Sequence, residues 1–587
     1  MDAQDERTLV DPRANPWAML ASLPLFAGLP KTVIDDAVAE LEWLSLPGGS
    51  QLFEAGAPAD SVYFVVSGCL GAFGPGGELV GRIAAGESVG EMGLIVSRPR
   101  AATVRALRDS ELARLSADTF ERVLLGHPQA ILRLARLSVQ RLLENAPARS
   151  AAPAAPRTIA LIPQDSAIDV ATLTAALVDA LAGLGRVDLV GSSRAGRHSS
   201  QWFHEVESRN DFVVYAAEPG DPPWTQLCVR QADVLLLAAR ARDEAGPWPA
   251  LQRHAHAAQR AELLLLHEGS IADGAAARWR RALPAAPCHH LRRPADMPRV
   301  VRLMTHRAVG LVMSGGGARG FAHLGVVRAL REHGVPIDLV GGTSMGGILA
   351  AGVAADWSDA ELVERFRRCF VDTNPLRDFT LPLVSLVSGR KVGRLLRREL
   401  GEVDIEDLPL PFFCVSSNLT TGRIAVHQQG PLWRWLRASV AIPGVLPPVF
   451  HGGEVFVDGG AMNNLPVDVM RAKDRGPVIG VDVGTDPVFT TDIDATEAPS
   501  FWNLFRRRHG RRRRPNILEI LWRSGMVNST TATFAHRGLC DLLLTPPLES
   551  LGLLDWRAFQ RAIDIGYRDA CERLRDGGLE LLKSTRT

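Results

Sequence analysis

A pattern of strand, glycine-rich turn and helix occurs twice between Val309 and Gly347 and limits most strongly what this chain can fold into. The apolar run at residues 309–313 predicts a buried strand, and three glycines follow it before a predicted amphipathic helix at residues 321–333. A second apolar run, residues 337–340, leads into the pentapeptide GTSMG, after which another helix is expected to begin. Both turns therefore join a buried strand to a helix through small residues.

The second turn carries Ser344 in the pattern G-x-S-x-G. Glycines on both sides let the backbone turn sharply and let a substrate approach the hydroxyl, while the helix behind the serine points its positive end at it. The N–H groups of the earlier glycine loop, Gly315 to Gly317, could hold the negative oxygen that forms when an ester carbonyl is attacked. A serine nucleophile needs a base, and Asp458 ends a predicted strand just before two glycines, where its carboxylate can reach into a cleft.

Three segments resemble, in this order, the patatin-like phospholipase family: residues 315–320 (GGGARG), 342–346 (GTSMG) and 458–460 (DGG). Two further segments, residues 439–448 and 463–466, resemble the same family. The resemblance extends over about residues 309–482 and implies a patatin-like α/β hydrolase domain.

The resemblance also implies a role for each site residue. Ser344 is expected to be the nucleophile and Asp458 the base of a Ser–Asp dyad that works without a histidine. Gly315, Gly316 and Gly317 are expected to form the oxyanion hole. Such a mechanism requires no metal and no catalytic cofactor.

Two other interpretations of these motifs are weaker. Gly315, Gly317 and Gly320 also fit the dinucleotide-binding spacing G-x-G-x-x-G, but no acidic residue ends a second strand about 20 residues later. A hydrolase triad in the order Ser, Asp, His would leave only His509 and His536 after the aspartate, and both lie in or beyond an arginine-rich tail. The dyad is therefore favoured.

The composition excludes several other classes of protein. The 587 residues should hold three or four domains, and a net charge of +1 predicts no global attraction to nucleic acid or to an anionic membrane. Seven cysteines without a C-x-x-C pair argue against zinc sites and disulfide frameworks. The N-terminus lacks a signal peptide, and no run of about 18 apolar residues predicts a membrane-spanning helix. We therefore expect a cytoplasmic protein whose contact with membranes, if any, is peripheral.

The first segment, residues 1–145 with a core at 23–145, alternates short strands with glycine turns. A predicted short helix beginning at Glu91 offers backbone N–H groups to an anion, and the guanidinium of Arg100 can pair with a phosphate. The segment resembles a β-roll cyclic-nucleotide-binding domain. This resemblance implies that Glu91 holds the ribose hydroxyl and Arg100 the cyclic phosphate, with Gly90 and Ala101 adding contacts. The choice between cAMP and cGMP stays open, as does the alternative of a scaffold that binds nothing.

The remaining chain divides into four parts. Residues 146–157 (APARSAAPAAPR) predict a linker, and residues 158–300 alternate strands with helices and predict a Rossmann-like α/β segment that lacks a phosphate-binding P-loop motif. The patatin-like domain is expected at 301–482, and residues 483–587 are expected to be a C-terminal extension packed on it. A cyclic-nucleotide domain, an α/β segment and a patatin-like domain in this order resemble neuropathy-target-esterase-like lysophospholipases.

Two segments of the catalytic half suggest contact with lipid. The loop at residues 379–391 (FTLPLVSLVSGRK) could line an acyl-chain groove or form a lid, and ordinary core packing is an equal alternative. Seven arginines between residues 506 and 514, next to aromatic residues, suit an anionic membrane surface, and a solvated loop is the alternative. No recognised nucleic-acid-binding fold accompanies this cluster.

The sequence therefore predicts a serine hydrolase of lipid carboxyl esters, a phospholipase or lysophospholipase, which a cyclic nucleotide could regulate. The alternatives are a broad-specificity esterase or triacylglycerol lipase, and a non-enzymatic cyclic-nucleotide sensor that only binds lipid. The head group, the chain length and the cleaved position stay open, as do the sign of regulation and the oligomeric state.

Overall fold

The structure is a computed structural model that describes residues 13–122, 127, 131–133, 136, 156–195, 199–246, 248, 259–283, 286–381, 383–484, 529 and 533–584. The chain forms two compact units: residues 1–267 with 278–301, and residues 268–277 with 302–587. Most of the predicted linker and the whole arginine cluster lie outside the described residues, as does most of residues 128–144, for which the sequence pattern predicts a helix.

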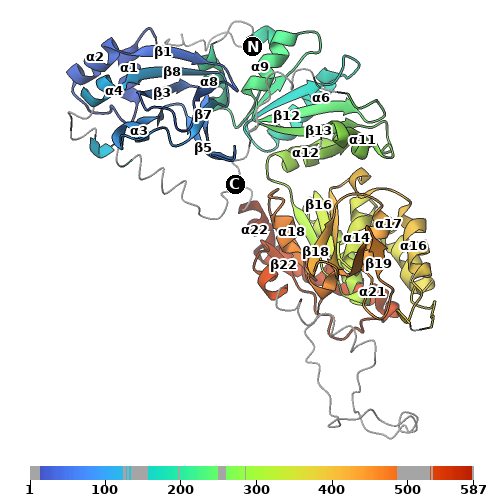
Figure 1. Cartoon of the computed structure of the whole chain (residues 1–587). Coiled ribbons are helices and arrows are strands. Elements are labelled where there is room, and N and C mark those ends of the chain that lie inside the picture. The colour runs from blue at the N-terminus through green and yellow to red at the C-terminus, as the bar shows by residue number, and fades with distance from the viewer. Residues whose placement is uncertain are drawn as a thin grey trace, which may run out of the picture. The chain divides into compact units, whose positions relative to one another are not determined.

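Unit 1 begins with two four-stranded antiparallel sheets that form a β-roll (Figure 1). One sheet has the order β1 (Glu42–Leu46), β8 (Ser110–Ser116), β3 (Ser61–Ser67), β6 (Ser88–Val89). The other has the order β2 (Gln51–Phe53), β7 (Thr103–Ala106), β4 (Cys69–Phe73), β5 (Leu79–Ala84). Strands β2 to β5 confirm the strands that the sequence predicts at residues 51–54, 61–67, 68–73 and 78–83, whereas β1, β6, β7 and β8 were not predicted.

Strand β3 explains how the β-roll is packed. Its side chains alternate between two cores, because successive residues of a strand point to opposite faces. Val62 and Phe64 pack with the short helices α1 (Pro16–Ser22), α2 (Lys31–Ala39) and α4 (Ala117–Phe120), while Tyr63 and Val65 pack between the sheets. The continuous apolar run of β3 is therefore needed because both of its faces are buried.

The second half of unit 1 is a six-stranded parallel sheet. Its order is β10 (Val187–Val190), β11 (Phe212–Ala216), β9 (Thr158–Pro163), β12 (Val234–Arg240), β13 (Arg260–Leu266), β14 (Cys288–Leu291). Helices α6 (Val170–Ala182), α8 (Ser200–Arg209), α9 (Pro222–Gln231) and α12 (Met297–Met304) connect or follow these strands. The predicted α/β segment is thereby confirmed: β9 to β13 match the strand runs that the sequence predicts at residues 158–162, 187–190, 211–216, 233–238 and 263–267, whereas β14 was not predicted.

A buried ionic cluster joins the β-roll to this sheet. Arg108, which follows β7, pairs with Glu207 of α8 and, over 2.8 Å, with Asp233 at the start of β12. Asp233 also accepts hydrogen bonds from the backbone N–H groups of Arg157 and Thr158. Because one guanidinium serves two carboxylates away from water, this contact fixes the β-roll on the α/β sheet.

Unit 2 is built on an eight-stranded mixed sheet. Its main path has the order β19 (Val449–His451), β20 (Glu454–Asp458), β17 (Phe412–Asn418), β16 (Leu339–Thr343), β15 (Gly310–Met313), β21 (Val478–Val481), β22 (Leu542–Leu544), and β18 (Arg423–His427) pairs with β17. The strands from β17 to β22 along this path are parallel, while β18 and β20 run antiparallel to β17. β16 and β20 thereby end on either side of β17.

Helices cover both faces of this sheet. On one face Leu311 and Met313 pack with α13 (Ala322–Glu332), α14 (Met345–Ala354) and α21 (Phe559–Arg573), and on the other Val312 packs with α18 (Val467–Arg471). The remaining elements are α15 (Asp359–Phe366), α16 (Arg390–Leu400), α17 (Leu432–Ser439), α22 (Leu579–Ser584), the 3-10 helix η3 (Gly317–Phe321) and the π-helical turn η4 (Arg367–Asp372).

Two glycines fix the close crossing of α13 and α21. A Cβ atom at Gly325 would lie 2.0 Å from the carbonyl oxygen of Ile563, and one at Gly566 would lie 2.1 Å from that of Ala322. Backbone thus meets backbone without intervening side chains, and the C-terminal helix lies directly on the helix that follows the glycine loop.

Candidate functional site

Ser344 occupies the sharp turn between β16 and α14. Its backbone has φ +53° and ψ −125°, a conformation that costs a non-glycine residue of order 1–3 kcal/mol and persists only where the surroundings impose it. Cβ atoms at Gly342 and Gly346 would lie 2.6 and 2.4 Å from the carbonyl oxygen of Met313. The two glycines therefore let the turn pack against β15, and the turn holds the serine hydroxyl clear of its own helix.

The structure brings Ser344 and Asp458, which are 114 residues apart, into contact. The Ser344 hydroxyl donates a hydrogen bond of 2.7 Å to Oδ2 of Asp458, and both side chains are buried, at 4 % and 2 % exposure. The other carboxylate oxygen of Asp458 accepts from the N–H of Gly460 over 2.8 Å. One oxygen is thus held by the backbone and the other faces the hydroxyl.

Burial sets the acidity of this carboxyl. Desolvation raises the pKa of Asp458 from 3.8 to about 7, and the hydrogen bonds from Ser344 and Gly460 lower it by less. A carboxylate with a pKa near 7 accepts a proton far better than an ordinary aspartate does, and it is still ionised in half of the molecules at that pH. The pair can therefore remove a proton from the serine hydroxyl without an imidazole.

The glycine loop lies beside the serine, and only part of it can act as predicted. A Cβ atom at Gly315 would lie 3.1 Å from the Cβ atom of Ser344, which shows how closely the loop approaches. The Gly315 N–H, however, donates to the carbonyl of Asn464 over 3.2 Å, so it is not available to a substrate oxygen. Gly316 and Gly317 make no such bond to other described residues and remain the usable donors of the predicted three.

Among the described residues, no histidine bonds to Ser344 or Asp458. His323 is fully buried under the glycine loop, where its ring Nε2–H donates a hydrogen bond to the carbonyl of Ser314 and burial lowers its pKa to about 4. His536 contacts the carbonyl of Leu465 instead, and His509 lies outside the described residues.

Two residues that support the site, Ser439 and Asn464, were not assigned a role from the sequence, whereas Arg319 was expected either to stabilise the glycine loop or to meet a phospholipid phosphate. The hydroxyl of Ser439, at the end of α17, accepts from the backbone N–H of Ser344 over 2.9 Å. The amide of Asn464 donates to the carbonyl of Gly315, so this residue holds the glycine loop from both sides. Arg319 turns away from the serine and donates to the carbonyl of Leu551 in the C-terminal extension. The first two fall in segments that the resemblance had marked, which was the only available signal.

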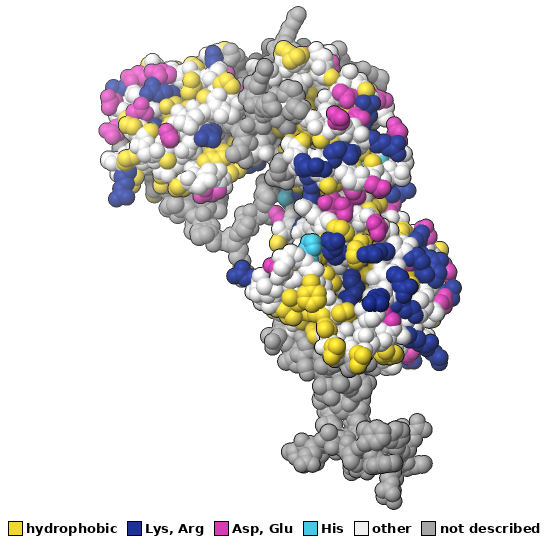
Figure 2. All heavy atoms as spheres, turned by 45° about the vertical axis from the view of Figure 1, so that its right-hand side comes forward, with side chains coloured by type: hydrophobic (Ala, Val, Ile, Leu, Met, Phe, Trp, Pro, Cys, Tyr) yellow, Lys and Arg dark blue, Asp and Glu magenta, His cyan; other side chains and the backbone are white. Residues whose placement is uncertain are grey.

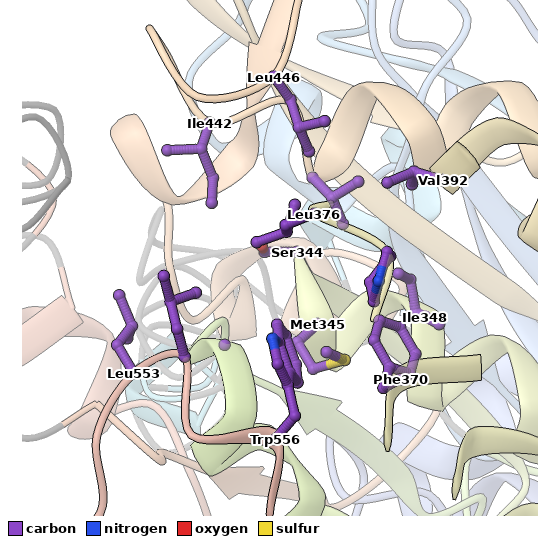
Figure 3. A pocket seen from close by; sticks show the side chains of 14 residues that line it. Ser344, Met345, Ile348, Phe370, Leu376, Val392, Ile442, Leu446, Leu553 and Trp556 are labelled. Carbon is purple, nitrogen blue, oxygen red and sulfur yellow. The ribbon is translucent and has the colours of Figure 1, made fainter. Parts of the chain in front are cut away.

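A pocket opens beside Ser344, and Figure 3 shows its lining. It contains about 520 Å³ of space free of protein atoms, its open mouth included. Apart from Gly317 and Ser344 the lining is apolar: Met345, Ile348, Phe370, Pro375, Leu376, Val392, Val440, Ile442, Leu446, Leu553, Leu554 and Trp556. Such a wall suits a hydrocarbon chain whose ester end meets the serine hydroxyl.

The C-terminal extension supplies one wall of this pocket. Leu553, Leu554 and Trp556 line it, and the carbonyl of Leu553 accepts from the N–H of Ala318. The same carbonyl lies 2.3 Å from where a Cβ atom of Gly317 would stand. The glycine loop is therefore held between the sheet and a segment that lies 232 residues later in the chain, counted from Arg319 to Leu551.

The predicted nucleotide site of the β-roll contains a buried arginine and a buried glutamate. Glu91 and Arg100 are 2 % and 4 % exposed, and Arg100 donates to the carbonyls of Gly90 and Ser61 and pairs with Asp60. Its Nε has no partner among the described residues. A Cβ atom at residue 90 would lie 2.4 Å from the guanidinium, so glycine is needed there, whereas the predicted contact residue Ala101 is exposed. The buried cation with a spare N–H next to a buried acid fits a ribose phosphate.

The loop that follows β9 in the α/β sheet of unit 1 forms no comparable phosphate-binding site. The loop that follows carries Asp165 and Asp169, whose carboxylates accept from the N–H groups of Ala167 and Thr172. The start of α6 is thus capped by the chain's own acids, which repel a phosphate. In the part of the chain that the structure describes, no group of three His, Cys, Asp or Glu could hold a metal ion, and all seven cysteines are free thiols.

Comparisons with known families agree with this layout. Residues 311–471 match the patatin-like phospholipase family, and residues 43–127 match the cyclic nucleotide-binding domain. Residues 156–309 match the neuropathy target esterase family P-loop like domain. A cyclic-nucleotide-binding domain, a P-loop-like domain and a patatin domain therefore follow one another in the chain.

Curated relatives are similar over nearly all of this chain. Patatin-like phospholipase domain-containing protein 6 of Homo sapiens is 29 % identical, over 95 % of this chain and 46 % of the human protein. An uncharacterized NTE family protein of Mycobacterium tuberculosis is 31 % identical, over 93 % of this chain and 94 % of that protein. Lysophospholipase nte1 of Aspergillus fumigatus is 28 % identical, over 93 % and 43 %. The chain thus spans less than half of the human and fungal proteins and nearly all of the mycobacterial one.

Proposed function

The chain belongs to the NTE family, and from this premise we propose that it is a serine hydrolase of lipid carboxyl esters whose substrates are phospholipids or lysophospholipids. The observation that carries the proposal is the 2.7 Å contact between the Ser344 hydroxyl and the Asp458 carboxylate beside an apolar pocket. A hydroxyl, a base and a hydrocarbon-lined wall are the three parts that cleavage of a fatty-acid ester needs.

In the acylation step, Asp458 takes the proton of Ser344 while the serine oxygen attacks the ester carbonyl carbon. The carbonyl oxygen becomes an oxyanion next to the N–H groups of Gly316 and Gly317, and loss of one such donor typically costs about 100- to 1,000-fold in rate. When the tetrahedral intermediate collapses, the bond to the alcohol oxygen breaks. That oxygen leaves with the proton from Asp458, and the acyl group remains on the serine.

Deacylation repeats the sequence with water. Asp458 takes a proton from a water molecule while the water oxygen attacks the acyl carbon. Collapse of this second tetrahedral intermediate releases the fatty acid, and the proton passes from Asp458 to the oxygen of Ser344. The N–H of Gly460 holds the far oxygen of the carboxylate, so the near oxygen faces the reacting atoms in both steps. The chemistry uses only side chains and backbone of unit 2.

Labelling with a fluorophosphonate tests the nucleophile. We expect the probe to attach to the full-length chain at Ser344 and not to Ser344→Ala, and we expect Ser344→Ala and Asp458→Asn each to remove nearly all hydrolysis of a lysophospholipid. Ser208→Ala, which changes an exposed serine of α8 in unit 1, is the matched control. A folded Ser344→Ala protein that keeps full activity would exclude the mechanism, and an unlabelled wild-type chain would favour a lipid-binding sensor.

Product analysis separates the esterase alternatives. The apolar wall selects for an acyl chain, so hydrolysis of long-chain lysophospholipids and phospholipids should exceed that of short-chain esters at equal concentration. Triacylglycerols in the same panel test the lipase alternative. Equal rates across a panel of defined lipids would favour a broad-specificity esterase instead.

We also propose that the β-roll binds a cyclic nucleotide, with Arg100 on the phosphate, Glu91 on the ribose hydroxyl, and Gly90 and Ala101 beside them. The buried Arg100 with its spare Nε, next to the buried Glu91, supports this assignment. Calorimetry of the full-length chain with cAMP and with cGMP tests it, and Arg100→Gln should abolish the heat. No heat with either nucleotide would reject binding, and a change in lipid hydrolysis on adding the bound nucleotide would reveal regulation.

A further inference from the structure

Four large apolar side chains project into solvent from the segment between η4 and α16. Phe379, Leu381, Leu383 and Val384 are 77, 79, 89 and 61 % exposed. The first three are the most exposed large hydrophobic residues among those that the structure describes. Neither the groove lining nor the core packing predicted for this segment holds for these four side chains. Exposing apolar side chains of this size to water is unfavourable in free energy.

The segment is an ordered hairpin, which we call the apolar hairpin and define as residues 379–381 and 383–387. Its stem is closed by the N–H of Thr380, which donates to the carbonyl of Leu386, and by a bridge between Phe379 and Val387. The return strand is also bonded to the body of unit 2, because the N–H groups of Leu386 and Val387 donate to the carbonyls of Gly444 and Val445. The exposed side chains are therefore held on a fixed base.

The base of the hairpin belongs to the rim of the pocket. Leu376 lines the pocket three residues before the hairpin, and Val392 lines it five residues after. The carbonyls that accept from the return strand lie between Ile442 and Leu446, which also line the pocket. Whatever takes up the hairpin tip is thus brought next to the opening that leads to Ser344.

The flanks of the hairpin are basic. From Thr373 to Arg398 there are six cationic side chains and one acidic side chain, although the whole chain carries a net charge of only +1. Asp378, the one acid, is engaged, because its carboxylate accepts from the hydroxyl of Ser388 and the N–H of Lys391. Figure 2, in which the side of unit 2 with α16 comes forward, shows Lys and Arg side chains gathered there with exposed hydrophobic side chains beside them.

Three of these cations are available to an anionic partner. Arg377 precedes the hairpin, and Arg390 and Arg394 follow it on the first two turns of α16. All three are exposed, and none forms an ion pair with another described residue. Arg397 and Arg398, by contrast, are engaged with Trp433 and Glu399.

We propose that the apolar hairpin and the three arginines Arg377, Arg390 and Arg394 form a docking surface for a bilayer that contains anionic phospholipid. The four apolar side chains enter the acyl region while the arginines meet the head groups, an arrangement typical of proteins that lie at the membrane interface. The inference rests on the proposed function, to which it adds a route: a lipid molecule reaches the pocket from the bilayer without exposing its acyl chain to water. Free cations around an apolar tip favour this partner over another protein.

Vesicle flotation of the full-length chain tests the surface. All proteins carry Ser344→Ala so that the vesicles stay intact, and the vesicles are either pure phosphatidylcholine or phosphatidylcholine with 30 % phosphatidylglycerol. The double variant Leu381→Asp/Leu383→Asp should lower the bound-to-free ratio at least about tenfold on both kinds of vesicle. Arg390→Gln/Arg394→Gln should lower it about fivefold per charge, and only on the anionic vesicles. Leu189→Asp, at an exposed leucine of β10, is the control and should bind as the parent does.

Three results would overturn the proposal: a parent protein that does not float, a hairpin variant that binds as well as its parent, and a hairpin variant whose mass by light scattering shows that it has lost a self-associated state. The last would make the hairpin an interface between copies of this chain. Hydrolysis of a water-soluble ester by the same variants with Ser344 restored separates this inference from the proposed function. Full hydrolysis with lost flotation supports docking, whereas no hydrolysis by the wild-type chain contradicts the function alone.

Discussion

The pH dependence of hydrolysis follows directly from the burial of Asp458. The carboxyl is 2 % exposed and its pKa is raised to about 7, and only its ionised form can take the proton of Ser344. The apparent second-order rate constant should therefore rise through pH 7 and level off above it. At pH 5 about 1 % of the molecules carry the ionised form, so the rate should be about 100-fold below its plateau.

The measurement is kcat/KM for a water-soluble, short-chain ester between pH 5 and 9, since such a substrate avoids any effect of pH on vesicles. The slope on the acid side should be about one logarithmic unit per pH unit. Asp458→Asn should show a low rate without this slope. A wild-type profile that is flat from pH 5 upward, or that turns near pH 4, would refute the argument that desolvation tunes this base.

The same shift has a consequence for stability, with a sign that can be worked out. When the pKa of an acid is higher in the folded protein than in the unfolded chain, the acid stabilises the fold at pH values below its unfolded-state pKa. This stabilisation is lost as the pH rises through the folded-state pKa. Here the window runs from about 4 to 7 and the loss is about 4 kcal/mol. Asp458→Asn cannot ionise, so its free energy of unfolding relative to wild type should grow across this window, as denaturant titrations at pH 4 and pH 8 would reveal.

Other perturbations are expected to act through single contacts. Ser439→Ala removes the acceptor for the Ser344 N–H and should lower kcat about tenfold with little change in KM, whereas equal changes in both would contradict a positioning role. Gly346→Ala places a Cβ atom 2.4 Å from the carbonyl of Met313 and should abolish fluorophosphonate labelling. Arg108→Leu leaves two largely buried carboxylates without their shared cation, although Asp233 keeps Arg82, so it should cost unit 1 about 3 kcal/mol in denaturant titrations while ester hydrolysis by unit 2 persists.

The sequence predicted those parts of the fold that depend on local pattern. The strand–glycine–helix units at residues 310–332 and 339–354 were predictable, because buried strands, glycine turns and amphipathic helices each leave a short-range signal. Strands β1 and β8 gave no clear signal because one face of each is exposed and charged, as in Glu42 opposite Arg114. The parallel sheet of unit 1 was predictable as a class, but strand order is decided by tertiary packing and left no local trace.

In the candidate site, too, local sequence pattern predicted some features and tertiary packing decided the others. Ser344 and Asp458 could be named from motifs, since each needs glycines at fixed offsets. The occupied N–H of Gly315 could not be foreseen, because its acceptor, Asn464, lies 149 residues later and pairs with it only through the fold. Trp556 likewise joins the pocket because α21 crosses α13, and its segment carries no motif that points to the serine.

In the proposed dyad, the glycines around Ser344 and Asp458 explain how an aspartate can take the place of a histidine. A Cβ atom at Gly459 would lie 2.4 Å from the carbonyl of Val415, so only glycine lets the end of β20 settle this deeply beside β17. The deep position strips water from Asp458 and raises its pKa, and Gly460 returns a single N–H that keeps one oxygen fixed. Because the carboxyl is desolvated and held by one backbone donor, the proposed mechanism uses it as a base near neutral pH. The two glycines of the D-G-G motif thus raise the pKa of Asp458 by allowing its burial. A variant that admitted water to Asp458 should lose activity at neutral pH even if the distance between Asp458 and Ser344 stayed the same.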